Sequence, residues 1–224
     1  MKVIIIIVKL IGGGSGMLKE TFSVQRLGGD AEFLSKWLVL ELAATIIGSK
    51  PSTILSITDT RNRPLLTLWR AFGPRILAGS PVCHLVLKET SDRLAILFYR
   101  RDMLEQCINQ PGHKEFLFRQ GYPVECGLHA CLRYLKRKFA GTCPHEIGIL
   151  LGIPLKDVLG FMGLSDQPLC CRGCWHIYGN PECSLAVMKR FHDDRDIVAG
   201  WLESGWAPYM VLAWRQKRPG ELVS

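Results

Sequence analysis

No apolar run in this sequence is long enough to cross a membrane. The run Val3–Val8 is interrupted by Lys9, whereas a spanning helix needs about 20 apolar residues. No clean small-residue cleavage site follows it, so a secretory signal is not indicated. The Gly-rich stretch Gly12–Gly16 before Met17 fits translation from an early start codon. We therefore expect residues 1–16 to be a non-native leader, residues 17–224 to form one domain, and the protein to be cytoplasmic with no membrane partner.

Several common catalytic signatures are also missing. The chain has no Gly-rich loop ending in Lys-Ser/Thr, no serine nucleophile elbow, no HExxH sequence and no paired-carboxylate motif. These absences remove the motif-based evidence for a P-loop nucleotide hydrolase, a serine hydrolase or a zinc protease. The sequence also has no internal repeat or low-complexity block, which leaves an ordinary globular composition.

Cysteine, in contrast, is abundant, and positive charge exceeds negative charge. The nine cysteines are an odd number, which argues against a secreted disulfide scaffold and favours reduced thiols in a cytoplasm. Lys and Arg outnumber Asp and Glu by 28 to 20, a net charge of +8. This excess permits anionic partners without requiring them. The main cluster (Arg133, Lys136, Arg137 and Lys138) is interpreted as the solvated face of a helix.

Periodicity predicts an α+β fold in which a small, mostly antiparallel sheet is covered by several helices. The runs 81–88 and 93–99 are rich in Val, Leu, Ile, Phe and Tyr and predict a hairpin. Ile54–Ile57 and 175–178 are shorter strand candidates. Helices are expected over 31–47 with Asp30 as N-cap, 65–72, 103–109, 114–119, 123–139 and 182–203.

The most ordered stretch is Cys143–Phe161. Pro144 suits a first helical position, and Ile147, Leu150 and Leu151 form one apolar face. Gly152 is then expected just past the helix end, and Pro154 begins a second short helix. We expect two short helices that meet in a tight corner at Gly152 and pack against the sheet.

Three segments carry a family resemblance: Gly121-Tyr122-Pro123, the long motif from Pro144-His145-Glu146 through Gly160-Phe161, and Trp175-His176-Ile177-Tyr178-Gly179. Leu42–Pro51 and the end of the 93–99 strand are also similar. Together they resemble an uncharacterised bacterial family, domain of unknown function 3793, typical of anaerobic Firmicutes. Cys143 and His176 stand where that family usually has Phe and Lys. The resemblance implies no established activity.

The paired helices also resemble a helix-turn-helix of the sigma-factor type, which would make Leu155–Met162 a recognition helix. Reading DNA needs Arg, Lys, Asn or Gln on that helix, yet Lys156 and Asp157 are its polar residues. Nucleic acid is therefore a disfavoured partner, and a buried helical hairpin is the alternative.

Candidate catalytic residues are His145, Glu146, Arg100 and Tyr178, which we expect around one modest site. His145 and Glu146 could serve acid–base chemistry, although adjacent helical positions point about 100° apart. Glu146 also suits a residue that stabilises the start of a helix. Lys50, before Pro51, and Arg100, at a strand end, could each meet an anion.

The metal candidates are Cys171, Cys174 and Cys183. The two-residue spacing of Cys171 and Cys174 suits two thiolates on one zinc or iron ion, and equally suits a dithiol redox pair. A closed metal site needs further ligands, which Cys143, His145 and His176 could also supply. Cys126 near His129 invites a thiol-enzyme interpretation, but a small buried thiol is the simpler one.

Three classes of function remain open. The first is an accessory protein of thiol, metal or electron-transfer metabolism, with a redox protein as partner. The second is a nucleic-acid-binding regulator that uses the helix-turn-helix-like hairpin. The third is a small hydrolase or transferase.

Overall fold

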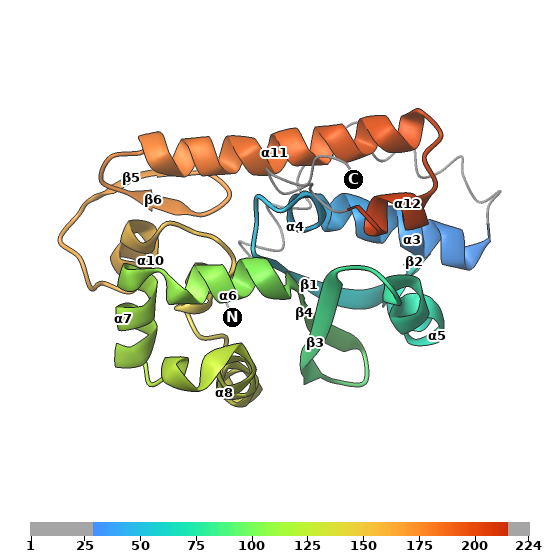
Figure 1. The fold of residues 1–224 in the computed structure, drawn as a ribbon. Coiled ribbons are helices and arrows are strands. Elements are labelled where there is room, and N and C mark those ends of the chain that lie inside the picture. Colours follow the sequence, from blue (N-terminus) through green and yellow to red (C-terminus); the bar gives the residue numbers. More distant parts are fainter. Residues whose placement is uncertain (1–28, 215–224) are drawn as a thin grey trace, which may run out of the picture.

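The computed structural model describes residues 29–214, so the expected leader over residues 1–16 lies outside the described residues. Helices and strands alternate irregularly along the chain (Figure 1). In chain order they are α3 (Asp30–Glu41), α4 (Ala43–Ile47), β1 (Ser52–Thr60), β2 (Arg63–Pro64), α5 (Leu65–Leu77), β3 (Val82–Glu89), β4 (Arg93–Arg100), α6 (Arg101–Asn109), α7 (Pro111–Arg119), the 3-10 turn η1 (Val124–Cys126), α8 (Gly127–Gly141), α9 (Ile147–Leu150), α10 (Leu155–Phe161), β5 (Leu169–Arg172), β6 (His176–Tyr178), α11 (Glu182–Glu203) and α12 (Pro208–Leu212).

The main sheet is antiparallel and has the strand order β2-β1-β4-β3. The predicted hairpin is confirmed, because β3 pairs with β4 from Val82↔Arg100 to Glu89↔Leu94. The Ile54–Ile57 run lies within β1, which pairs with the other edge of β4. β5 and β6 form a separate two-stranded hairpin. The α+β class and the mostly antiparallel sheet are thus as expected.

The sheet separates two hydrophobic cores, and the alternation along β4 assigns its side chains to them. Leu94, Ile96 and Phe98 join the core under α3 and α5, whereas Ala95 and Leu97 join the core under α6 and α8. This is the period of two that a strand buried on both faces requires.

Helix α11 crosses from one core to the other. Near its start Met188 belongs to the core that contains α6 and α8, and ten residues later Val198 belongs to the core that contains α3 and α5. Figure 1 shows α11 as the long helix that runs from the β5–β6 hairpin to α12. Its middle therefore lies over the junction between the two cores.

Several predicted helix boundaries were wrong, and those of α3, α4 and α5 differ as follows. Asp30 is the first residue inside α3, whose N-cap is Gly29, and the expected helix over 31–47 breaks at Leu42 into α3 and α4. Helix α5 continues through Pro74 to Leu77 instead of ending at Phe72. Gly73 helps the helix to pass Pro74, because the Cβ that makes a residue before proline resist the helical conformation is absent in glycine. A Cβ at Gly73 would also lie 2.3 Å from the buried Trp69 ring.

The corner in the central stretch is confirmed. Gly152 has a φ of +77° between α9 and α10, a left-handed conformation that glycine adopts without strain. The corner packs on the start of β1, where the Ser52 hydroxyl donates to the Leu150 carbonyl at 2.6 Å. A Cβ on Gly152 would approach Pro51 to 2.9 Å. Both the bend and the close contact therefore require glycine.

Candidate functional site

Asp157 on α10 holds the β5–β6 hairpin in place. One carboxylate oxygen accepts from the Trp175 indole at 2.8 Å and from the Ser184 hydroxyl at 2.5 Å. The other accepts from the Tyr178 amide at 2.9 Å and from Lys156 at 2.7 Å. Burial raises the pKa of this carboxyl, but these hydrogen bonds outweigh it and leave the pKa lowered. Asp157 is thus an ionised structural centre, and Tyr178, a predicted catalytic residue, is tied to it through its backbone.

The ring of Tyr178 packs on α10. A Cβ on Gly160 would lie 2.3 Å from the Tyr178 ring, so the glycine leaves room for the aromatic side chain. Lys156 also donates to the Tyr178 carbonyl at 2.8 Å. The packing of the Tyr178 ring on Gly160 is therefore a sufficient structural reason for both residues of the motif.

Glu146 has a similar structural position. Its carboxylate is buried, forms an ion pair with Lys138 and accepts from the Tyr122 hydroxyl at 3.3 Å. It therefore links α8, the turn before η1 and the start of α9. His145 beside it is exposed, and its imidazole lies edge-on to Phe161 with 5.1 Å between ring centroids.

Arg100 lies at the junction of β4 and α6. It pairs with Asp102 at 2.8 Å and donates to the Ile46 carbonyl at 3.3 Å. Within residues 29–214, no hydrogen bond, ion pair or ring contact joins any two of the four predicted catalytic residues, His145, Glu146, Arg100 and Tyr178. Their catalytic role stays a prediction.

The predicted thiol ligands lie on and beside the second hairpin. Cys171 and Cys183 are exposed, Cys174 is half-buried, and all nine cysteines are free thiols. In the part of the chain that the structure describes, no three His, Cys, Asp or Glu side chains are grouped to hold a metal ion. The geometry of residues 29–214 therefore supplies no closed zinc or iron site.

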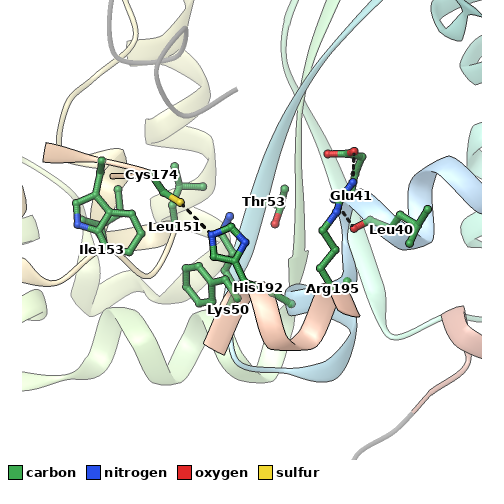
Figure 2. A pocket seen from close by; sticks show the side chains of 13 residues that line it. Leu40, Glu41, Lys50, Thr53, Leu151, Ile153, Cys174, His192 and Arg195 are labelled. Atoms are coloured by element: carbon green, nitrogen blue, oxygen red, sulfur yellow. Dashed lines mark hydrogen bonds and ion pairs between the residues drawn. The ribbon is translucent and has the colours of Figure 1, made fainter. Parts of the chain in front are cut away.

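A pocket lies where α11 crosses the junction of the two cores (Figure 2). Its volume is about 70 Å³, enough for a few water molecules or the short end of a small metabolite. It is lined from α3 and α4, the start of β1, the corner after α9, the β5–β6 turn and α11. The lining residues are Leu40, Glu41, Ala43, Ala44, Lys50, Thr53, Leu151, Ile153, Cys174, Trp175, Phe191, His192 and Arg195.

Lys50 is the buried cation of this pocket, with 5% of its surface exposed. The turn after α4 places it there, because the amides of Gly48 and Lys50 both donate to the Ala44 carbonyl. Within residues 29–214 its ammonium has no hydrogen bond or ion pair, and it lies 5.3 Å from the centroid of the Phe191 ring. Burial lowers the pKa of Lys50 from 10.5 to about 8.

Cys174 and His192 meet in the same pocket from different elements. The thiol of Cys174, in the β5–β6 turn, lies 3.6 Å from Nε2 of His192 on α11, and Figure 2 shows the two directed at each other. Burial raises the pKa of Cys174, while the charge of Lys50 acts in the opposite direction. The thiol is therefore protonated at rest, with an imidazole beside it that could take its proton.

Glu41 and Arg195 form the other polar part of the pocket. Arg195 donates to the Leu40 carbonyl at 3.0 Å and to the Glu41 carboxylate at 3.2 Å. Burial raises the pKa of Glu41 despite this partner. One residue earlier on α11, Asp194 accepts a hydrogen bond from Ser49. These bonds fix α11 against the turn that carries Lys50.

Chemically, the pocket combines a thiol, an imidazole that could accept its proton and a buried ammonium. The sequence indicated two of these groups, Lys50 as an anion contact and Cys174 as a metal ligand, but not that they share a pocket. It missed His192, Glu41 and Arg195. The only available signal was the spacing of Phe191, His192 and Arg195 within the predicted helix 182–203, which places them near one face.

Within residues 29–214, no helix has the length and apolar character needed to cross a membrane. Comparison with curated proteins and with solved structures finds no match to the chain. Comparison with protein families finds a match over residues 38–212 to the family described as "Protein of unknown function (DUF3793)". That range contains every residue that lines the pocket and the three motif segments of the sequence, and the chain therefore belongs to the DUF3793 family.

Proposed function

We propose that the protein catalyses a thiol-dependent group transfer on a small carbonyl compound, with Cys174 as the nucleophile. The observation that carries this proposal is the approach of Cys174 Sγ to His192 Nε2, at 3.6 Å, inside the pocket that also holds Lys50. A nucleophile and a base from separate elements within reach of one another are the usual arrangement of thiol catalysis. The proposal lies within the thiol-metabolism class and overlaps the class of small hydrolases and transferases.

Each of the three groups has one role in the proposed step. The Sγ–H proton passes to His192 Nε2, the sulfur–carbon bond forms, and the carbonyl π electrons move to the oxygen. The Lys50 ammonium stabilises that oxyanion. Collapse expels the leaving group, which takes the proton from His192, and water or a second nucleophile then releases the acyl group from sulfur.

The protonation states agree with these roles near neutral pH. With a pKa of about 8, roughly 90% of Lys50 is ammonium at pH 7 and can stabilise negative charge. Because burial raises the pKa of Cys174, its thiol needs the adjacent base to become a nucleophile. The chemistry also needs free thiols, and we place the protein in a reducing bacterial cytoplasm, such as that of an anaerobe.

The nucleic-acid alternative gains no support from the described residues. Lys156, the one cationic residue of α10, is bonded to Asp157 and to the Tyr178 carbonyl, and the β5–β6 hairpin packs on this helix. Helix α10, which would have to enter the major groove of DNA, is therefore partly covered by the β5–β6 hairpin, and its one cationic side chain is already bonded.

Acylation by p-nitrophenyl acetate, followed by peptide mass spectrometry, tests the proposal. We expect an acetyl group on Cys174, and acylation slower by about 10²-fold or more in H192Q, the contribution expected of a general base. C174S should lose the adduct, and the matched control C183S should not. The proposal would be contradicted if Cys174 stayed unmodified while the exposed thiols Cys126, Cys170, Cys171 and Cys183 were acetylated. An unchanged rate in H192Q would also contradict it.

A further inference from the structure

A second and larger concavity lies between the exposed face of α8 and strand β3. Its volume is about 780 Å³, and its lining residues are Leu87, Pro123, Cys126, Ala130, Arg133, Lys136, Arg137 and Ala140. The pocket of Lys50 shares none of these residues. We refer to this concavity as the α8 groove.

The α8 groove has cations on its wall, and none of the described residues that line it carries a carboxylate. Arg133, Lys136 and Arg137 are exposed and have no hydrogen bond or ion pair within residues 29–214; Arg137 stacks over the Tyr134 ring at 5.6 Å. The adjacent carboxylate, Glu125, forms an ion pair with Lys114. In the described part of the chain, neighbouring side chains therefore leave the positive charge in the groove without neutralisation.

The sequence interpretation grouped Lys138 with these three residues as a solvated face. The structure separates them, because Lys138 turns away to pair with buried Glu146, whereas the other three line a concavity. From Arg133 to Arg137 the helix advances about 6 Å, so the three cations form one compact cluster. Two of them are arginines, whose guanidinium groups match phosphate oxygens in pairs.

We propose that the α8 groove binds a small metabolite that carries several phosphoryl groups, such as a nucleoside triphosphate. Its volume lies within the range of about 300–1,000 Å³ typical of small-molecule sites. Its eight lining residues are far fewer than the roughly 20–30 that each side of a stable protein interface contributes. Among residues 29–214, no aromatic side chain lines it, so this part of the chain offers no platform on which the bases of single-stranded nucleic acid could stack. Leu87, Pro123 and Ala130 supply an apolar floor for the rest of the ligand.

Calorimetric titration with inorganic triphosphate and with adenosine triphosphate, at about 100 mM salt, tests the proposal. We expect saturable binding of both that is at least about tenfold weaker in the triple variant R133Q/K136Q/R137Q. The control R61Q/R75Q/R190Q removes the same charge from exposed positions elsewhere and should bind as the unmodified protein does. The single variants R133Q and R137Q keep the test decisive if the triple variant does not fold.

Cys126 reports binding inside the groove, because its thiol is exposed there. Triphosphate should slow alkylation of Cys126 by iodoacetamide and leave alkylation of the exposed Cys183 unchanged. The proposal is overturned if neither phosphate compound binds, if both triple variants bind equally, or if an acidic peptide binds in place of triphosphate. None of these outcomes depends on Cys174 chemistry, so this site and the proposed function stand or fall separately.

Discussion

Replacement of Lys50 by Met should stabilise the protein near neutral pH. Lys50 is 5% exposed, and burial lowers its pKa from 10.5 to about 8. Each unit of this pKa difference corresponds to about 1.4 kcal/mol. Burial of the ammonium therefore lowers the free energy of unfolding by about 3 kcal/mol when Lys50 is protonated in both the folded and the unfolded state. Met has a similar length and no charge, and the lost cation–π contact with Phe191 is worth about 2 kcal/mol at a desolvated site. We therefore expect K50M to raise the free energy of unfolding by about 1 kcal/mol at pH 7.

The gain should depend on pH in a defined direction. Below pH 8 Lys50 is protonated in both states and the cost is fully present. Between pH 8 and 10.5 the unfolded chain binds a proton that the native protein has released, so the unmodified protein gains stability with rising pH relative to K50M. Above pH 10.5 the electrostatic difference should vanish.

Urea denaturation of both proteins in reducing buffer, from about pH 6 to pH 10, measures this difference, and other titrating groups cancel in the subtraction. The control K36M removes a half-exposed lysine that pairs with Glu32 and should change stability by no more than about 0.5 kcal/mol. The reasoning fails if K50M is less stable than the unmodified protein at every pH, or if the difference is constant with pH. A gain in stability with loss of acyl transfer would mark Lys50 as a functional residue maintained at the expense of stability.

Three further predictions concern the scaffold and the thiols. D157A should lower the free energy of unfolding by about 3–5 kcal/mol in urea denaturation, because buried donors lose their acceptor. The pKa of Asp157 is lowered in the folded protein, so its stabilising effect should be present above pH 3.8 and should be lost as the pH falls further. G160A should lower the free energy of unfolding by about 1–3 kcal/mol, because the added Cβ would clash with the Tyr178 ring. The control G141A, where a Cβ meets nothing within 4 Å, should leave the stability nearly unchanged. A similar loss of stability in both variants would contradict the packing argument. Brief alkylation of the native protein, mapped by mass spectrometry, should modify the exposed thiols and spare the two buried thiols, Cys107 and Cys131. Burial raises the pKa of each of these two thiols to about 11. Early modification of Cys107 or Cys131 would contradict their assignment to the core.

The fold was largely predictable because local patterns determine it. The apolar and aromatic composition of 93–99 and the spacing of 182–203 predicted β4 and α11, and Gly152 predicted the corner. The errors came from tertiary contacts that override local preference. Helix α5 continues through Gly73 and Pro74, and its buried Trp69 and Leu77 pack in the core that also contains residues of α3, a long-range packing that no local pattern in the sequence indicates.

The site was far less predictable, because it is assembled from distant segments. Ser49 and Asp194, which fasten the Lys50 turn to α11, are 145 positions apart, and no spacing rule links them. Glu146 and Tyr178 were selected because they lie in ordered motifs, yet their contacts with Lys138 and Asp157 are structural. A motif in a single sequence marks a physical constraint without stating whether that constraint serves the fold or the chemistry.

The β5–β6 hairpin contains residues that serve the fold and the residue that we propose for the chemistry. Asp157 binds Trp175, just before β6, and Tyr178, the last residue of β6, and Cys174 directly precedes Trp175. Because Trp175 and Ile177 are buried in the core and Cys174 packs against it, packing and this carboxylate together fix the position of the thiol. The conservative D157N keeps the shape but weakens the acceptor, so it should slow acylation of Cys174 while leaving Lys50 untouched, and its pH–rate profile should keep the midpoint of the unmodified protein. A shifted midpoint would mean that Asp157 acts on the ionisation of the pocket itself, and the motif would then belong to the chemistry rather than to the scaffold.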